Sequence, residues 1–221
     1  ETLFPYTTLF RSHDFSEAKN HFEAQAAQDA CVQTSGALKT CAIALMKIAN
    51  DIRFLGSGPR LGLGELEIPA VQPGSSIMPG KVNPVIAESM IMISAQVVGN
   101  DAAIAVGGMQ SYFELNTMLP LIAYNLLQSV EILSTGSRMF AETLIDGLEA
   151  KTANIEAKNE QSLSLATALA PIIGYDKAAS IAKESYSTGK TVRTLAEEQQ
   201  VLPKDELDRV LDLRRQTDPG V

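Results

Sequence analysis

The longest regular pattern in the sequence is a row of mostly apolar residues that recurs every three or four positions before Gly56. Its members are Cys31, Thr34, Leu38, Cys41, Leu45, Ile48, Ile52 and Leu55. That spacing puts them on one side of an α-helix. No proline interrupts the stretch from Phe22 to Phe54. The pattern therefore predicts a single helix over that stretch, roughly 45–50 Å long at about 1.5 Å per residue.

Two further long helices are expected after residues 56–80, which are rich in glycine and proline. Pro84 can begin the first of them, because a proline in the first helical turn loses no hydrogen bond. An apolar row then continues toward 107–108 through Ile86, Met90, Ile93 and Val97. The second begins near Thr117 and runs to about Leu144. Three long helices joined by loops predict an elongated, mostly antiparallel bundle.

Shorter helices are expected beyond Gly147. The pattern predicts helices at about 155–170, 175–186 and 191–198, a helix cap at Gly189, and a last helix begun by Pro203. We therefore predict an all-α fold. It comprises a partial central bundle domain over 13–146, a small helical C-terminal domain over 147–213, and a frayed tail over 214–221.

Residues 1–12 differ from the rest of the sequence. The run 2–12 resembles the in-frame translation of a common short-read sequencing adapter, and it is unusually rich in aromatic residues. A signal peptide fits less well, because Arg11 is at the wrong end and there is no long apolar core. We predict that 1–12 is not native, and that the native frame begins near His13 inside a longer protein.

Charge and composition argue against several classes of function. A net charge of −8 argues against a nucleic-acid partner. The sequence contains no run of about 18 apolar residues, so no membrane span is expected. Cys31 and Cys41 are separated by roughly 15 Å on one predicted helix, too far for a disulfide. We expect two buried free thiols in a reducing cytoplasm. The histidines, His13 and His21, form no cluster with metal-ligand spacing, so no metal is expected.

The segment 74–84 carries most of the candidate chemistry. It reads Gly-Ser-Ser-Ile-Met-Pro-Gly-Lys-Val-Asn-Pro. Its two glycines, Gly74 and Gly80, permit backbone amides to turn toward a ligand. Its polar side chains supply two hydroxyls, a cation and an amide that can bind a carboxylate. A surface turn between two helices is the structural alternative.

This segment resembles the signature loop of the fumarase/aspartase superfamily, in the form found in class II fumarases. Three other segments resemble class II fumarases as well: KIANDIRFLGSGPR at 47–60, the run 107–116 that ends in YFELN, and IGYDKAA at 173–179. The resemblance implies a helical lyase that removes a proton next to a carboxylate and expels a group from the neighbouring carbon. It implies reversible hydration of fumarate to (S)-malate in the tricarboxylic acid cycle, without a cofactor, in the cytoplasm.

The resemblance also implies roles for individual residues. Ser75 would be the catalytic base, made strong enough by loop amides and Lys81 to remove the C3 proton of malate. The substrate carboxylate would be held by Ser76, Lys81, Asn83 and the backbone of Val82. Glu88 would pair with a catalytic histidine from another subunit. The alternative reading of Glu88 is a solvated charge on a helix.

The chain departs from the superfamily pattern in one respect. The family builds each active site from three segments on three subunits of a homotetramer, and two of those segments are not found in this sequence: a Thr-His pair and a Ser/Thr-rich loop. We therefore expect this chain alone to be inactive. Two alternatives stay open, an aspartate ammonia-lyase or other superfamily lyase, and a non-catalytic helical scaffold.

Overall fold

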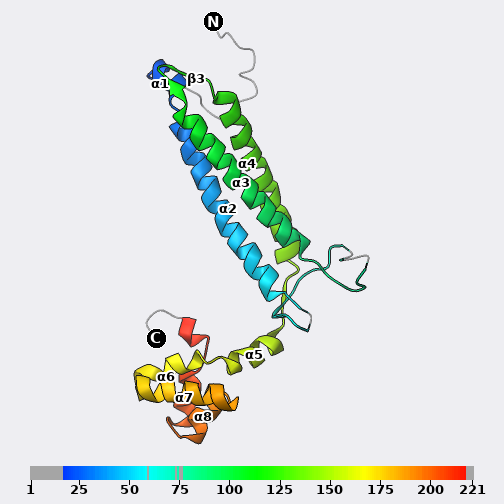
Figure 1. Ribbon diagram of the computed structural model, residues 1–221, viewed down its shortest axis with the longest axis vertical. Coiled ribbons are helices and arrows are strands. Elements are labelled where there is room, and N and C mark those ends of the chain that lie inside the picture. Colours follow the sequence, from blue (N-terminus) through cyan, green and yellow to red (C-terminus); the bar gives the residue numbers. More distant parts are fainter. Residues whose placement is uncertain (1–16, 59, 73, 75–76, 218–221) are drawn as a thin grey trace. The chain divides into compact units, whose positions relative to one another are not determined.

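The computed structural model describes residues 17–58, 60–72, 74 and 77–217. The described part of the chain is mostly helical, which confirms the predicted all-α fold (Figure 1). Residues 1–12, interpreted above as non-native, lie outside the described residues, and so do Ser75 and Ser76. The chain divides into two units. The first combines the described part of Glu1–Phe54 with Ile68–Leu148, and the second combines Leu55–Glu67 with Glu149–Val221.

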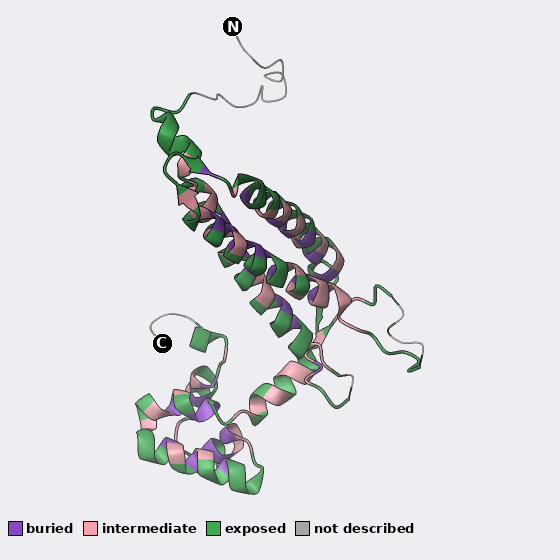
Figure 2. Cartoon of the chain, turned by 45° about the horizontal axis from the view of Figure 1, so that its top comes forward, coloured by how far each residue is buried: buried purple, intermediate pink, exposed green. Residues whose placement is uncertain are grey.

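The first unit is built on three long helices that lie side by side (Figures 1 and 2). Its elements are α1 (His21–Ala26), α2 (Asp29–Leu55), α3 (Val85–Met109), the hairpin strands β2 (Ser111–Tyr112) and β3 (Leu115–Asn116), α4 (Leu119–Phe140), and the π-helical turn η2 (Ala141–Ile145). The hairpin joins α3 to α4, and Pro120 lies in the first turn of α4 as expected.

The prediction of one uninterrupted helix from Phe22 to Phe54 is wrong. The chain leaves the helical conformation at Ala27, whose φ of −83° and ψ of 130° are those of an extended residue. Asn20 caps the short helix α1, because its side-chain oxygen accepts from the backbone N–H of Phe22 and of Glu23. A capped helix of six residues therefore precedes α2.

The buried side of α2 is also not the predicted one. Its buried residues are Ser35, Ala42, Ala49 and Ile52, and of the predicted row only Ile52 is buried. Small residues recur every seven positions on the buried side. The larger residues of the predicted row lie beside them, on a face that the described chain covers only in part. The expectation of two buried thiols fails for the same reason: Cys31 is half-buried and Cys41 is exposed, although both are free.

A buried carboxylate links α2 to α3. Asp101 of α3 accepts hydrogen bonds from Ser35 Oγ at 2.8 Å and from Lys39 Nζ at 2.5 Å. Burial alone would raise the pKa of Asp101. The hydrogen bonds from Lys39 and Ser35, together with the Lys39 charge, outweigh it and hold the pKa below the ordinary value. Both Asp101 and Ser35 are buried, so the contact fixes how these two helices meet.

The helix α3 is unusually apolar. Its most apolar 18-residue window has a mean hydropathy of 1.4, and 39% of that window is buried. Within the described residues it is the one helix long and apolar enough to cross a membrane by length and composition. The sequence prediction rested on the lack of an unbroken apolar run, and Glu88, Gln96 and Asp101 do interrupt α3. One such helix is weak evidence for a membrane span, since a core helix passes the same test, and Met90 and Ile104 of α3 are fully buried.

The second unit is a cluster of short helices. They are α5 (Thr152–Gln161), α6 (Leu165–Ile173), α7 (Tyr175–Thr188), α8 (Val192–Glu198), α9 (Lys204–Val210) and the 3₁₀ turn η3 (Arg215–Thr217). Strand β1 (Leu66–Glu67) pairs antiparallel with β4 (Glu149–Ala150). The core consists of Leu165, Ala166, Leu169, Ala178, Ile181, Val192, Leu195, Ala196, Leu207 and Leu211.

Two sequence predictions for the second unit have opposite outcomes. Gly189 ends α7 in the left-handed region with φ of 74°, which confirms the predicted cap. The predicted helix over 155–170 is wrong, because the chain breaks between α5 and α6. Ser162 is extended there, and its hydroxyl accepts from the backbone N–H of Ser164. The tail expected to fray forms the turn η3, and its last residues, 218–221, lie outside the described residues.

Candidate active-site loop

The loop before α3 contains a tight turn that explains two of its residues. The backbone N–H of Lys81 donates to the carbonyl of Met78 at 3.3 Å. Pro79 occupies the second position of this turn, and Gly80 occupies the third with φ of +77°. This is the pattern of a type II turn, in which proline fits the second position and the third requires a left-handed residue. The backbone conformation of this turn therefore explains why proline is followed by glycine here.

The base of the loop is closed by Gly74 and Asn83. The side-chain amide of Asn83 donates to the carbonyl of Gly74 at 2.5 Å. A Cβ added to Gly74 would lie 1.7 Å from the carbonyl oxygen of Lys81. No side chain fits at that separation, so glycine is required where the two arms of the loop cross. One of the two N–H groups of the Asn83 amide is thus used within the loop.

The other predicted site residues are accessible. Lys81 and Val82 are exposed, and Asn83 and Glu88 are half-buried. Glu88 lies in the first turn of α3. Lys81 makes no ion pair with any described residue, so its ammonium group can meet a ligand. The structure brings Gly74, Lys81 and Asn83 together, whereas Ser75 and Ser76 lie outside the described residues and Glu88 forms no described contact with the loop side chains.

The loop leads into the N-terminal end of α3. Pro84 stands at the capping position and provides no side-chain hydrogen bond. The N-terminal end of a helix carries partial positive charge and backbone N–H groups without partners. An exposed lysine, an asparagine amide and this helix end together favour an anionic ligand such as a carboxylate.

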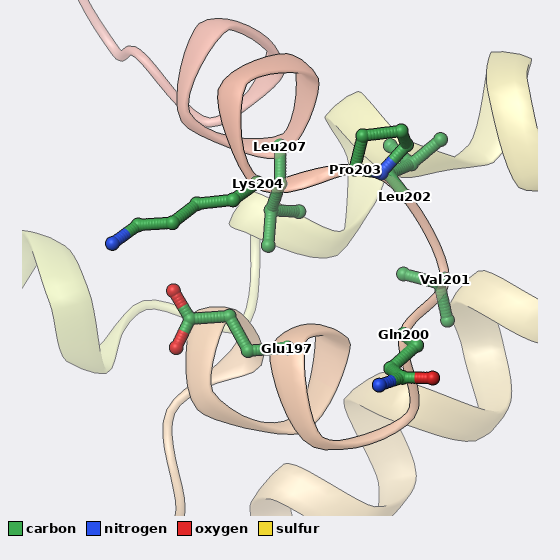
Figure 3. A pocket seen from close by; sticks show the side chains of 7 residues that line it. All are labelled: Glu197, Gln200, Val201, Leu202, Pro203, Lys204 and Leu207. Carbon is green, nitrogen blue, oxygen red and sulfur yellow. The ribbon is translucent and has the colours of Figure 1, made fainter.

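Among the described residues, no group of three or more His, Cys, Asp and Glu side chains is arranged to hold a metal ion. His21 instead forms an exposed pair with Glu17 at 3.2 Å. A separate hollow of about 590 Å³ lies in the second unit, between α8 and α9. Figure 3 shows the side chains of Glu197 and Lys204 extending to the same side of it, and Gln200 and Leu207 also line it. One carboxylate, one lysine, one amide and apolar neighbours do not form a catalytic set, so the loop is the better candidate.

The buried polar residues of α3 escaped the sequence reasoning. Besides Asp101, Asn100 donates from Nδ2 to Ser129 Oγ and Gln128 Oε1, both at 3.0 Å, and so links α3 to α4. Two adjacent polar residues in the middle of a mostly apolar helix are the signal that could have revealed both. They hold the bundle together and lie within α3, away from its N-terminal end.

Two family models and several known proteins match this chain. A model described as lyase matches residues 8–99, and one described as fumarase C C-terminus matches residues 165–217. The class II fumarate hydratase of Thermosynechococcus vestitus is 55% identical over 197 residues, which cover 89% of this chain and 42% of that protein. That of Corynebacterium glutamicum is 50% identical over 205 residues, covering 90% and 43%.

Two solved structures of related proteins are similar to this chain in fold. The class II fumarase of Schistosoma mansoni has a TM-score of 0.86 at 37% identity, covering 98% of this chain and 46% of that one. The fumarate lyase:delta crystallin of Brucella melitensis, in a structure described as bound to cobalt, has a TM-score of 0.85 at 44% identity, covering 96% and 46%. In sequence and in fold, this chain therefore resembles the class II fumarases of the fumarase/aspartase superfamily. It spans less than half the length of the relatives it matches.

Proposed function

We propose that this chain is part of a fumarate hydratase, which interconverts fumarate and (S)-malate in the tricarboxylic acid cycle. The observation that carries the proposal is the loop 74–84, whose type II turn and crossed arms present Lys81 and Asn83 beside the N-terminal end of α3. A dicarboxylate is the kind of ligand that such a set of donors and positive charge binds.

In the proposed reaction, the oxyanion of Ser75 takes the C3 proton of malate. The electron pair left on C3 is delocalised onto the adjacent carboxylate, where negative charge accumulates. Ser76, Lys81, Asn83 and the backbone N–H of Val82 stabilise that charge. The C2–O bond then breaks, the hydroxyl leaves as water after protonation, and the C2–C3 double bond of fumarate forms. Stabilising charge that develops only during the reaction lowers its barrier without tightening substrate binding.

Glu88 is proposed to act indirectly, by orienting a histidine that another subunit supplies. The position of Glu88 in the first turn of α3 suits a carboxylate, because negative charge is favoured at a helix N-terminus. Since the proposed histidine and the second substrate-binding segment are not found in this chain, we propose that the chain alone is inactive. The proposed reaction requires no cofactor and no metal.

We also propose that the complete protein is a homotetramer in which bundle helices of different subunits pack together. Large apolar side chains on the outside of α3 and α4 support this: Met92, Met109, Tyr124 and Leu127 are each at least 65% exposed. A helix that is apolar on all sides, as α3 is, needs cover on more than one side. We propose a cytoplasmic location without nucleic-acid or membrane partners, although one of the relatives is named a mitochondrial enzyme.

Two other functions are separable by experiment. The chain can be joined to the N-terminal part of the Thermosynechococcus vestitus fumarate hydratase, whose C-terminal part it resembles at 55% identity. The joined enzyme should hydrate fumarate, which is measured as the loss of fumarate's ultraviolet absorbance. It should release no ammonia from aspartate. Ammonia release alone would favour an aspartate ammonia-lyase. A folded, assembled and fully inactive enzyme would favour a scaffold.

A further inference from the structure

A short strap, defined here as residues 61–67, precedes the candidate loop and belongs to the second unit. Its backbone is tied to the end of α2 by three hydrogen bonds. Gly64 N–H donates to the carbonyl of Ser57 at 2.6 Å, and Leu63 N–H donates to its hydroxyl at 3.1 Å. Glu65 N–H donates to the carbonyl of Leu55 at 2.9 Å. These bonds use N–H groups of the strap and leave its carbonyl groups to bond elsewhere.

Helix α5 supplies partners for these carbonyl groups. Asn154 Nδ2 donates to the carbonyl of Leu63 at 3.0 Å and to that of Gly64 at 2.7 Å. Lys158 Nζ donates to the same Leu63 carbonyl and lies 3.5 Å from a carboxylate oxygen of Glu65. The backbone N–H of Lys151 donates to the carbonyl of Glu65 at 2.9 Å, and β1 pairs with β4. Three consecutive carbonyls of the strap are thus bonded to groups from residues 151–158.

The last turn of α5, which also contains Lys158, is attached to the helix cluster by charge. Arg193 of α8 donates from Nε to the two carboxylate oxygens of Glu160 at 3.3 and 3.2 Å. Its Nη1 donates to Asp208 of α9 at 2.6 Å. Helix α5 itself has no fully buried residue. It is therefore anchored mainly by polar contacts, to the strap through Asn154 and Lys158 and to the helix cluster through Glu160. Contacts of that kind open more readily than an apolar core.

We propose that α5 is a strut through which the C-terminal helix cluster holds the strap, and that Asn154 and Lys158 are positioning residues for the segment leading into the active-site loop. Glu67 lies seven residues before Gly74, so the strap leads into the candidate loop. The link to catalysis rests on the proposed function. The strut itself is a property of the second unit. An event that displaces Arg193 from Glu160 is transmitted along α5 to the strap, although Arg193 does not touch it.

Amide hydrogen exchange of the full chain tests the contacts between α5 and the strap. Asn154→Asp keeps the side-chain shape but places an acceptor against two carbonyls, and Lys158→Met removes the ammonium group while keeping a long side chain. Each should accelerate exchange at Leu63, Gly64 and Glu65 by roughly 5- to 30-fold, the effect of losing one or two net hydrogen bonds. Lys158→Arg should restore protection. Asn159→Ala is the matched control, because Asn159 is exposed on the same helix and its side chain makes no described hydrogen bond.

Neutralising the two partners of Arg193 in turn tests the coupling. Glu160→Gln should accelerate exchange in the strap, whereas Asp208→Asn, which weakens the same arginine's contact with α9, should leave the strap unchanged. Unchanged strap exchange in Asn154→Asp and in Lys158→Met would overturn the positioning role. Equal effects of Glu160→Gln and Asp208→Asn would overturn the strut. Exchange in 165–211 reports whether the cluster stays folded, and because no turnover is measured, the result does not depend on the proposed reaction.

Discussion

Replacing Asp101 by alanine tests whether the buried contact between α2 and α3 stabilises the bundle. The change leaves the hydroxyl of Ser35, a buried residue, without its acceptor, at a cost of about 1–3 kcal/mol. The side chain of Lys39 is 39% exposed, so its ammonium group can turn to water, and losing its ion pair adds only about 0–1 kcal/mol. We therefore expect the free energy of unfolding of the first unit to fall by about 1–4 kcal/mol.

Urea unfolding followed by far-ultraviolet circular dichroism measures this loss. With a slope of about 2 kcal/mol per molar urea, the midpoint of the bundle transition should fall by roughly 0.5–2 M. Asp51→Ala is the matched control, since Asp51 pairs with Lys47 on the surface of α2, where its side chain is 50% exposed; its change should stay within about 0.5 kcal/mol. Equal midpoints for the two variants would refute the reasoning.

Three further outcomes follow from the structure. Acidification should destabilise the bundle through Asp101, whose folded-state pKa is lowered. Its contribution to the free energy of unfolding is present above the unfolded pKa of about 3.9 and is lost as pH falls through the folded value. In acid unfolding curves, the difference in stability between wild type and Asp101→Asn should therefore close. Gly74→Ala should disrupt the loop, since the new methyl would meet the Lys81 backbone, and fumarate hydration by the joined enzyme should fall; Gly36→Ala, in open space on α2, should instead stabilise the chain by about 0.5–1 kcal/mol in thermal unfolding. Lys81→Met in the joined enzyme should lower kcat/KM by roughly 100-fold or more if its charge stabilises the reacting carboxylate, whereas Lys204→Met on α9 should leave it unchanged; equal values for the two would exclude that role.

The sequence predicted the helices best where a local signal marks their ends. Pro120 and Pro203 fix φ through their rings, and Gly189 permits a left-handed conformation that other residues rarely adopt. Each lies where it was expected. The breaks at Ala27 and Ser162 were missed. Neither residue forbids a helix. At Ser162 the hydroxyl accepts from the backbone N–H of Ser164, a bond that competes with helix continuation.

Burial was harder to predict than helix type. The row on α2 was chosen by the spacing of mostly apolar residues, but the buried positions at Ser35, Ala42 and Ala49 carry small residues. A polar residue such as Ser35 is buried because Asp101 accepts its hydrogen bond, and that partner is 66 residues away in the sequence. The assignment of Leu55–Glu67 to the second unit likewise depends on distant side chains, those of Asn154 and Lys158.

The candidate loop was found from its residue types and from its resemblance to the superfamily signature loop, and the structure adds the reasons for two of its residues. Gly80 is needed by a type II turn, and Gly74 is needed where the arms of the loop cross. Asn83 was expected to bind substrate, yet its amide also closes the loop. No pattern in the sequence distinguishes a donor used within the loop from one offered to a ligand, because both need the same amide.

The role of Ser75 is the central claim, and the rate of fumarate hydration by the joined enzyme tests it most directly. Ser75→Ala should be compared with Ser187→Ala, which removes a hydroxyl from an exposed position on α7. We predict that Ser75→Ala lowers kcat by roughly 100-fold or more, the usual contribution of a positioned base, while Ser187→Ala keeps the wild-type rate. An unchanged kcat in Ser75→Ala would contradict the assignment of the loop as the catalytic site.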